Sequence, residues 1–182
     1  PDPEALAEAA AERVVGVLAA AVAERGVAHL ALTGGSTAAA LYLRLAASPR
    51  REALDWSRVE LWWGDERFVL PDDPASNAGM ARDTLLGGGL PIVAERIHPF
   101  PVEAAMREGP GAAWAAKTYA ERLRARVPAG RDGLPSSTSS CLAWAPTGTS
   151  CRCSRIARRS PRERRSRWPC PHPRTSSRTC PG

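Results

Sequence analysis

The stretch Val27-Ala28-His29-Leu30-Ala31-Leu32-Thr33-Gly34-Gly35-Ser36-Thr37 decides the fold. Its first six residues form a short apolar run, which predicts a strand buried in a parallel sheet. Thr33, two glycines and two further hydroxyl residues follow, and an Ala/Leu-rich segment then continues to about Ala47, where Ser48-Pro49 ends it. A strand that turns through Gly-Gly into a helix indicates an α/β protein.

The segments on either side continue this alternation. Upstream, Asp2 predicts a helix cap, Pro3 suits the first helical position, and Gly26 is a natural helix end. The apolar row expected on that helix is Leu6, Ala10, Val14, Val17 and Ala21. Downstream, we predict strands at 59–63 and 97–100 and helices at 77–86 and 112–126. The predicted fold class is α/β, with a mainly parallel sheet flanked by helices.

The turn Gly34-Gly35-Ser36-Thr37 is the first candidate site. Glycines let a ligand approach the backbone, and the free N–H groups at a helix start attract anions. The two hydroxyls add donors, so the turn suits a phosphate ester. The alternative is a tight turn with a Ser or Thr helix cap. The pattern is neither the Walker motif nor the dinucleotide fingerprint.

A second candidate site is Gly64-Asp65-Glu66-Arg67, which follows the strand ending in Trp62-Trp63. Open α/β sheets place their ligands at the carboxyl ends of strands. Arg67 is suited to hold an anionic or carbonyl oxygen, and Asp65 to orient hydroxyls or water. The alternative is a local ion pair. His98 is a weaker candidate for a general base, and a structural role is expected more often for a histidine in such a position.

Composition divides the chain into two parts. Residues 1–132 hold 15 Lys and Arg against 18 Asp and Glu, a net charge of −3, whereas residues 133–182 hold ten Arg against one Glu, a net charge of +9. All five Cys lie in this tail. It shows no zinc-ligand spacing and no aromatic interleaving, so we expect no metal site and no nucleic-acid partner. We predict an irregular or disordered tail, because it has few apolar residues.

The first part of the chain resembles the family of 6-phosphogluconolactonases, over roughly residues 2–131. The resemblance is carried by Ala31 to Thr37, Trp56 to Val69, Asp72 to Arg82 and Ile97 to Pro99, including Gly-Asp-Glu-Arg and Ser-Asn-Ala-Gly-Met-Ala-Arg. The related glucosamine-6-phosphate deaminases are expected to have Asp-Glu-Tyr where this chain has Asp65-Glu66-Arg67.

The resemblance implies a Rossmann-like fold, a phosphorylated sugar lactone as substrate, no metal or organic cofactor, and a cytoplasmic, membrane-free place in the pentose phosphate pathway. It implies that Gly34, Gly35, Ser36, Thr37 and Asn77 bind substrate and that Asp65 and Arg67 lie in the catalytic pocket. The oligomeric state is left open.

The tail departs from the family. After about residue 135 the family is expected to have a strand such as Phe-Asp-Val-Leu-Leu-Leu and then Gly-Met-Gly-x-Asp-Gly-His, whose His is the general base. The displayed sequence has Ser136 to Cys141 and then Leu142 to Ser150. Codons built from the last base of one displayed codon and the first two of the next permit every expected residue. We therefore hypothesise a one-base frameshift near Ser136 in the gene or in its sequence.

These interpretations divide the chain into an N-terminal lactonase part, 1–135, and an out-of-frame tail, 136–182. We predict hydrolysis of 6-phospho-D-glucono-1,5-lactone to 6-phosphogluconate, impaired in this chain because the His motif is missing. One alternative is a sugar-phosphate isomerase or deaminase of the same superfamily. Another is a non-enzymatic protein whose basic tail binds nucleic acid. The opening Pro1-Asp2-Pro3 also leads us to expect an incomplete chain.

Overall fold

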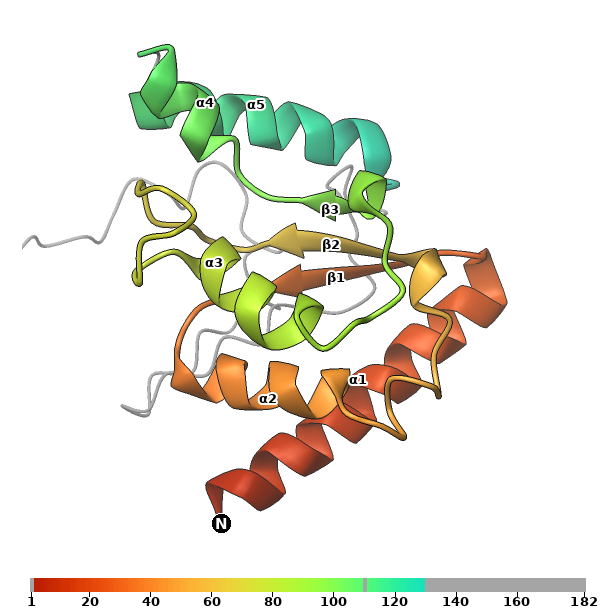
Figure 1. Cartoon of the computed structure of the whole chain (residues 1–182). Helices are drawn as coiled ribbons and strands as arrows, with labels where there is room; N and C mark the ends of the chain where they lie inside the picture. Colours follow the sequence, from red (N-terminus) through yellow and green to blue (C-terminus); the bar gives the residue numbers. More distant parts are fainter. Residues whose placement is uncertain (1, 110, 130–182) are drawn as a thin grey trace, which may run out of the picture.

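A small parallel sheet forms the centre of the computed structural model, which describes residues 2–109 and 111–129 (Figure 1). Within this part the strands are β1 (Ala28–Leu32), β2 (Val59–Trp63) and β3 (Ile97–His98), in the order β1-β2-β3. Both pairings are parallel, with Leu30 opposite Leu61 and Trp62 opposite His98. The predicted α/β fold with a parallel sheet is therefore confirmed.

Helix α1 (Pro3–Arg25) begins and ends as predicted. The Asp2 carboxylate accepts a hydrogen bond from the Glu4 N–H at 3.2 Å, and Gly26 ends the helix at a φ of 74°. The predicted apolar row was partly wrong. The buried row is Ala7, Ala11, Val14, Val15, Leu18 and Ala21. Alanines surround most of this helix, so the elements that pack against it, rather than its periodicity, select the buried face.

The remaining elements connect and cover the strands. Helix α2 follows β1, helix α3 continues into the π-helical turn η2 between β2 and β3, and α4 and α5 follow β3. Their bounds are α2 (Ser36–Ala46), η1 (Trp56–Arg58), α3 (Asn77–Ala81), η2 (Arg82–Leu86), η3 (Ala94–Arg96), α4 (Val102–Arg107) and α5 (Gly111–Arg126). The predicted helices at 77–86 and 112–126 are confirmed, while α4 was not predicted.

Alternation along the strands divides the sheet into two faces. Leu30 and Leu61 belong to the main core, which also includes side chains of α1, α2 and η2. We call this side the α2 face. Trp62 lies on the opposite side, which we call the α5 face, and packs there with Tyr119 of α5. Period-two alternation in the strands thus separates a large apolar core from a smaller one.

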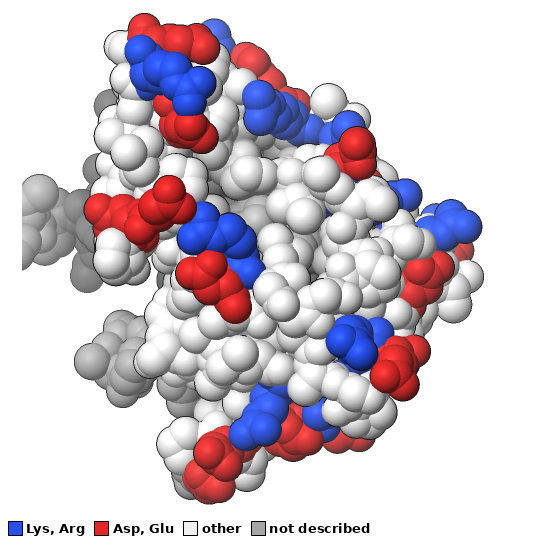
Figure 2. Space-filling view, in the orientation of Figure 1, with Lys and Arg blue, Asp and Glu red and all other residues white. Residues whose placement is uncertain are grey.

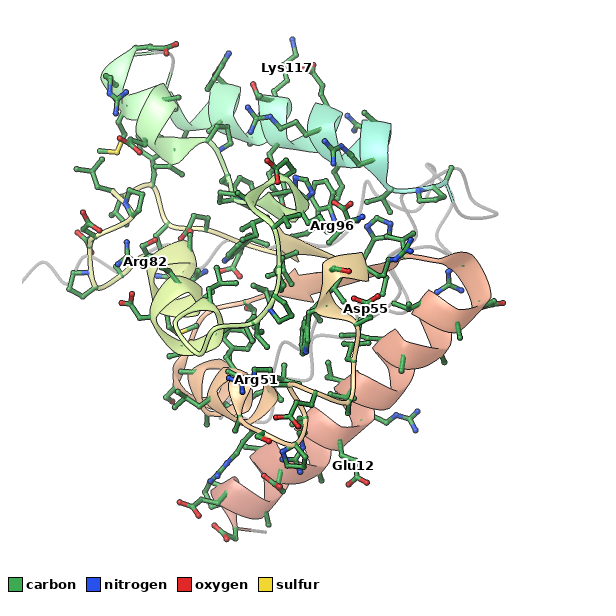
Figure 3. All side chains as sticks on the ribbon, turned by 45° about the vertical axis from the view of Figure 1, so that its right-hand side comes forward. Glu12, Arg51, Asp55, Arg82, Arg96 and Lys117 are labelled. Atoms are coloured by element: carbon green, nitrogen blue, oxygen red, sulfur yellow. The ribbon has the colours of Figure 1, made fainter. Side chains whose placement is uncertain are left out.

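Charges lie mostly on the outside of the described part. Glu12 and Lys117 point outward from α1 and α5 (Figure 3). On the face shown in Figure 2, Lys and Arg side chains lie among Asp and Glu rather than gathering into a basic patch. No helix in the described part is both long and apolar enough to cross a membrane. The predictions for the tail 136–182, and the boundary at residue 135, fall outside the described residues.

Candidate active site

The turn after β1 leaves the start of α2 open. Gly35 is the N-cap of α2 at a φ of 99°, a conformation that favours glycine, and no side chain among the described residues caps the helix. The predicted alternative of a Ser or Thr cap is therefore wrong: Ser36 and Thr37 occupy the first helical positions. Both are exposed, and their N–H groups lie in the first turn, where the helix dipole attracts anions.

Tyr42 of α2 holds the turn in place. Its hydroxyl donates to the Thr33 carbonyl at 2.9 Å and accepts from the Thr33 N–H at 2.8 Å. Burial raises the pKa of Tyr42 to about 12, so the hydroxyl keeps its proton at neutral pH. The backbone where β1 ends is thus anchored to the helix that it leads into.

Asp65 joins this turn to the loop after β2. The Thr33 hydroxyl donates to Asp65 Oδ1 at 3.0 Å, and the Gly64 N–H donates to the Leu32 carbonyl at 2.8 Å. Two segments more than 30 residues apart in sequence therefore meet at the carboxyl edge of the sheet, as predicted for ligand sites in open α/β sheets.

Asn77, at the start of α3, lies between the same two segments and is buried. Its Nδ2 donates to the Asp65 carbonyl at 3.0 Å and to Asp65 Oδ2 at 3.2 Å. A Cβ on Gly34 would lie only 1.9 Å from Asn77 Oδ1. Gly34 is therefore required for space rather than for a positive φ. The substrate-binding role of Asn77 stays a prediction, while its contacts make it a residue that positions Asp65.

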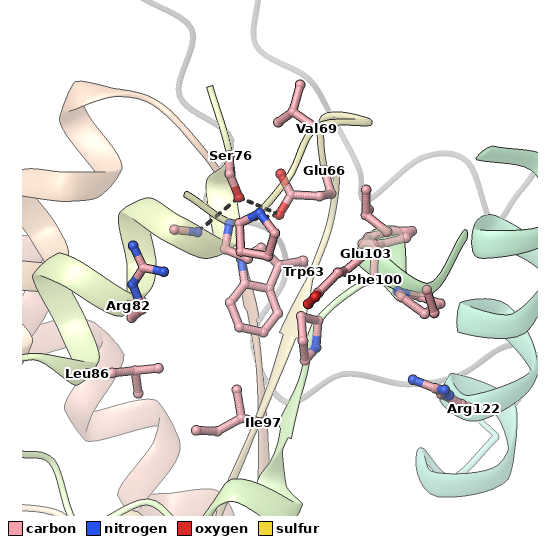
Figure 4. Close-up of a pocket in the computed structure, with 17 residues that line it drawn as sticks. Trp63, Glu66, Val69, Ser76, Arg82, Leu86, Ile97, Phe100, Glu103 and Arg122 are labelled. Carbon is pink, nitrogen blue, oxygen red and sulfur yellow. Dashed lines mark hydrogen bonds between the residues drawn. The ribbon is translucent and has the colours of Figure 1, made fainter. Parts of the chain in front are cut away.

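Glu66 has a structural function that the sequence did not reveal. Its carboxylate accepts from the N–H groups of Asn77 and Ala78, both at 2.7 Å, at the start of α3. Ser76 is the N-cap of α3, and its hydroxyl accepts from the Gly79 N–H at 3.0 Å (Figure 4). The Glu66 carboxylate therefore stabilises the start of the helix that carries Asn77.

Arg67 follows on the exposed part of the same loop. Among the described residues, its side chain makes no hydrogen bond or ion pair, so its guanidinium is available to an anion. The structure brings Asp65 and Asn77 into contact with the turn, but it does not bring Arg67 into such a contact. The described residues therefore do not form the local ion pair that was the alternative interpretation of Gly64-Asp65-Glu66-Arg67.

His98 lies away from the candidate site, on the α5 face of the sheet. It pairs with the buried Glu60, which also accepts from Arg96 at 2.8 Å, and its ring stacks on Trp62. His29 accepts at Nδ1 from the Trp62 indole N–H at 3.2 Å, and burial lowers its pKa. Both histidines therefore have structural partners, in agreement with the structural role expected for His98.

Two cavities border this part of the molecule. One, of about 410 Å³, lies between Glu66, the start of α3 and α4, and Trp63 forms part of its wall (Figure 4). The other, of about 380 Å³, lies on the α5 face and is lined by Ala31, Gly64, Tyr119 and Val127. No group of three or more potential metal ligands occurs among the described residues. The site as described offers N–H groups, hydroxyls, one carboxylate and one guanidinium.

Known proteins resemble this chain in both sequence and structure. The family profile described as Glucosamine-6-phosphate isomerases/6-phosphogluconolactonase matches residues 1–140. The 6-phosphogluconolactonase of Streptomyces coelicolor is 42% identical over 139 residues, which cover 74% of this chain and 51% of the relative. That of Mycobacterium tuberculosis is 43% identical over 100 residues, 55% of this chain and 39% of the relative.

Solved structures agree. The 6-phosphogluconolactonase of Trypanosoma brucei matches with a TM-score of 0.58 and 27% identity, over 70% of this chain and 49% of that one. That of Shewanella baltica matches with a TM-score of 0.56 and 30% identity, over 70% and 49%. The chain thus spans about half the length of the relatives or less. It belongs to the glucosamine-6-phosphate isomerase/6-phosphogluconolactonase family.

Proposed function

We propose that the complete protein hydrolyses 6-phospho-D-glucono-1,5-lactone to 6-phosphogluconate. The contact between Thr33 Oγ1 and Asp65 Oδ1 carries the proposal, because it places an anion-binding helix start next to a carboxylate. The two relatives described above are named 6-phosphogluconolactonase, and Asp65-Glu66-Arg67 differs from the Asp-Glu-Tyr expected of the deaminases. A cytoplasmic location and a place in the pentose phosphate pathway belong to the same proposal.

The phosphate of the substrate docks on the first turn of α2. The N–H groups and hydroxyls of Ser36 and Thr37 contact it, and Gly35 leaves room for its approach. Binding energy from this remote group then positions the lactone ring. Thr33 and Asn77 hold Asp65 in one orientation, from which its carboxylate orders a substrate hydroxyl or the attacking water.

Hydrolysis requires water to add to the lactone carbonyl and the ring oxygen to leave. Arg67 stabilises the negative charge that develops on the carbonyl oxygen. A general base must also remove a proton from the water. The described residues place no histidine at this site, because His29 and His98 lie on the α5 face with structural partners. Protein with the displayed 182-residue sequence is therefore proposed to be nearly inactive.

A lactone-hydrolysis assay tests the proposal, with the spontaneous reaction as background. For the displayed 182-residue chain, turnover is expected near background. The second sample is the frame-restored protein, which is the product of a gene in which one added base near codon 136 restores the other frame. For this protein, turnover is expected well above background. In that product Arg67→Ala is expected to reduce kcat by about 100-fold. Arg58→Ala, an exposed arginine at the opposite end of β2, is the matched control and should change little.

Two outcomes count against the proposal. High turnover by the displayed chain would contradict the requirement for the missing motif. Turnover of glucosamine-6-phosphate in place of the lactone by the frame-restored product would favour the isomerase or deaminase reaction. Resequencing the genomic DNA across codons 130–150 tests the frameshift separately. An alternative frame that lacks the Gly-x-Gly-x-x-Gly-His pattern would exclude the frameshift hypothesis.

A further inference from the structure

Both tyrosines of the 182-residue sequence are buried, and each makes the same pair of hydrogen bonds at the end of a strand. The Tyr42 hydroxyl donates to the Thr33 carbonyl at 2.9 Å and accepts from the Thr33 N–H at 2.8 Å. The Tyr119 hydroxyl donates to the Trp63 carbonyl at 2.8 Å and accepts from the Trp63 N–H at 2.6 Å. Each hydroxyl thus binds both backbone groups of a single residue.

The two hydroxyls hold the strand pair β1–β2 from opposite sides. The Gly64 N–H donates to the Leu32 carbonyl, so these two groups lie between the strands. Backbone groups of successive strand residues point to alternate sides. The N–H and carbonyl of Thr33 therefore point away from β2, and those of Trp63 point away from β1. The tyrosines also come from α2 and α5, which lie on opposite sides of the sheet (Figure 1).

On the outer side of β2, the Tyr119 hydroxyl takes the place of a strand. Within the described sheet, β3 ends at His98, opposite the residue before Trp63, and Pro99 has no N–H to donate. Buried backbone groups without a partner destabilise a fold. Tyr119 satisfies both groups of Trp63, and its ring stacks on Phe100, which fixes the position of the hydroxyl.

The residues held in this way are the last ones before the two loops of the candidate site. Thr33 leads directly into the turn at 34–37, and Trp63 lies two residues before Asp65. The two loops meet where the Thr33 hydroxyl donates to Asp65 Oδ1 at 3.0 Å. A shift of either strand end would therefore move one loop relative to the other.

We propose that Tyr42 and Tyr119 are a pair of positioning residues, which fix the anion-binding turn and the Asp65 loop relative to each other through the backbone of the strand ends. The kinetic consequence rests on the proposed lactonase reaction. Tyr42 supports the turn that binds the phosphate in the substrate and the transition state alike, so its loss raises KM. Tyr119 supports the loop of Asp65 and Arg67, which act on the transition state, so its loss lowers kcat.

Amide hydrogen exchange measured by NMR tests the positioning without any catalysis. The contacts lie within residues that the displayed protein and the frame-restored protein share, so both are samples. In the unmodified chains, the Thr33 and Trp63 amides should exchange within about tenfold of the Leu30 amide, in the middle of β1. Much faster exchange of either amide in the unmodified chains would overturn the proposal without the need for any variant.

The Gly64 amide distinguishes a positioning role from a local one, because it bonds to Leu32 and to neither tyrosine. Tyr42→Phe and Tyr119→Phe should each speed exchange about 100-fold at the amide that loses its hydroxyl partner. Each variant should also speed exchange of the Gly64 amide by about tenfold, since the strand ends are then free to shift. An unchanged Gly64 amide in both variants would show a purely local role and overturn the proposal.

Lactone hydrolysis by the frame-restored protein tests the kinetic consequence. Tyr42→Phe should raise KM by about tenfold with kcat within about twofold, and Tyr119→Phe should lower kcat by about tenfold with KM within about twofold. Leu18→Val, which shortens a buried side chain of α1, is the control for a general loss of packing and should leave both constants within about twofold.

A reversed split between KM and kcat, or effects no larger than those of Leu18→Val, would overturn the proposal. Absence of lactone hydrolysis by the unmodified frame-restored protein would contradict the proposed function alone. The exchange of the Gly64 amide would then still decide whether the two tyrosines position the strand ends.

Discussion

Replacing Gly34 by alanine should break the link between the turn after β1 and Asp65. The new Cβ would lie 1.9 Å from Asn77 Oδ1 and 2.7 Å from its Cγ, far inside van der Waals contact. Asn77 is only 5% exposed and has little freedom to move aside. Moving it breaks the two hydrogen bonds from its Nδ2 to Asp65, one of them to the carboxylate. Together these losses amount to about 2–4 kcal/mol of the free energy of unfolding.

Urea unfolding followed by tryptophan fluorescence measures this loss in the frame-restored protein. At a typical dependence on denaturant, the midpoint should fall by about 1–2 M. Gly16→Ala, on α1, is the matched control. Apart from the backbone of its own helix, its new methyl meets no atom within 4 Å, and the free energy of unfolding should rise by about 0.5–1 kcal/mol. In an Asn77→Ala background the clash is absent, so Gly34→Ala should then cost less than about 1 kcal/mol. An equal cost in both backgrounds would refute the reasoning.

Three further changes test the supports of the site. Tyr42→Phe removes both hydrogen bonds to Thr33 and should lower the free energy of unfolding by about 1–3 kcal/mol, against no change for Leu43→Ala at an exposed position. Glu66→Gln weakens two hydrogen bonds to the start of α3 and should lower the free energy of unfolding by about 1–2 kcal/mol, measured by calorimetry. An unchanged midpoint of thermal unfolding would contradict the role of Glu66 in fixing α3. Burial lowers the pKa of His29, so the unfolded chain binds a proton that the folded chain rejects, and stability should fall from about pH 7 to pH 5.5. His29→Asn should make that decline shallower, and an identical slope would argue against it.

The first two strands could be predicted because they are short apolar runs followed closely by glycine, whereas the third strand, predicted over 97–100, ends at His98 because Pro99 cannot donate a ladder hydrogen bond. The segment 59–63 was predicted with the bounds that the structure has, and Ala28–Leu32 within one residue. The buried row of α1 was less predictable, because Ala-rich sequence offers several similar faces and packing against α2 chooses among them.

The candidate site could be predicted only in part. Glycines, hydroxyls and strand ends mark the turn at 34–37 and the loop at 65–67, and the structure brings Asp65 against Thr33. The structural roles of Glu66 and Tyr42 could not be predicted. Glu66 accepts hydrogen bonds from backbone N–H groups 11 and 12 residues away, and Tyr42 accepts one from a backbone N–H group nine residues away. Such pairings depend on how elements pack, and local sequence patterns do not encode them.

The most direct test of the central claim is whether the turn at 34–37 binds a sugar phosphate. Amide chemical shifts of the frame-restored protein are followed by NMR during titration with 6-phosphogluconate and, separately, with gluconate, which lacks the phosphate. We predict saturable shifts of the Ser36 and Thr37 amides with 6-phosphogluconate and none with gluconate. Equal responses to both compounds, or shifts confined to other parts of the molecule, would contradict the account.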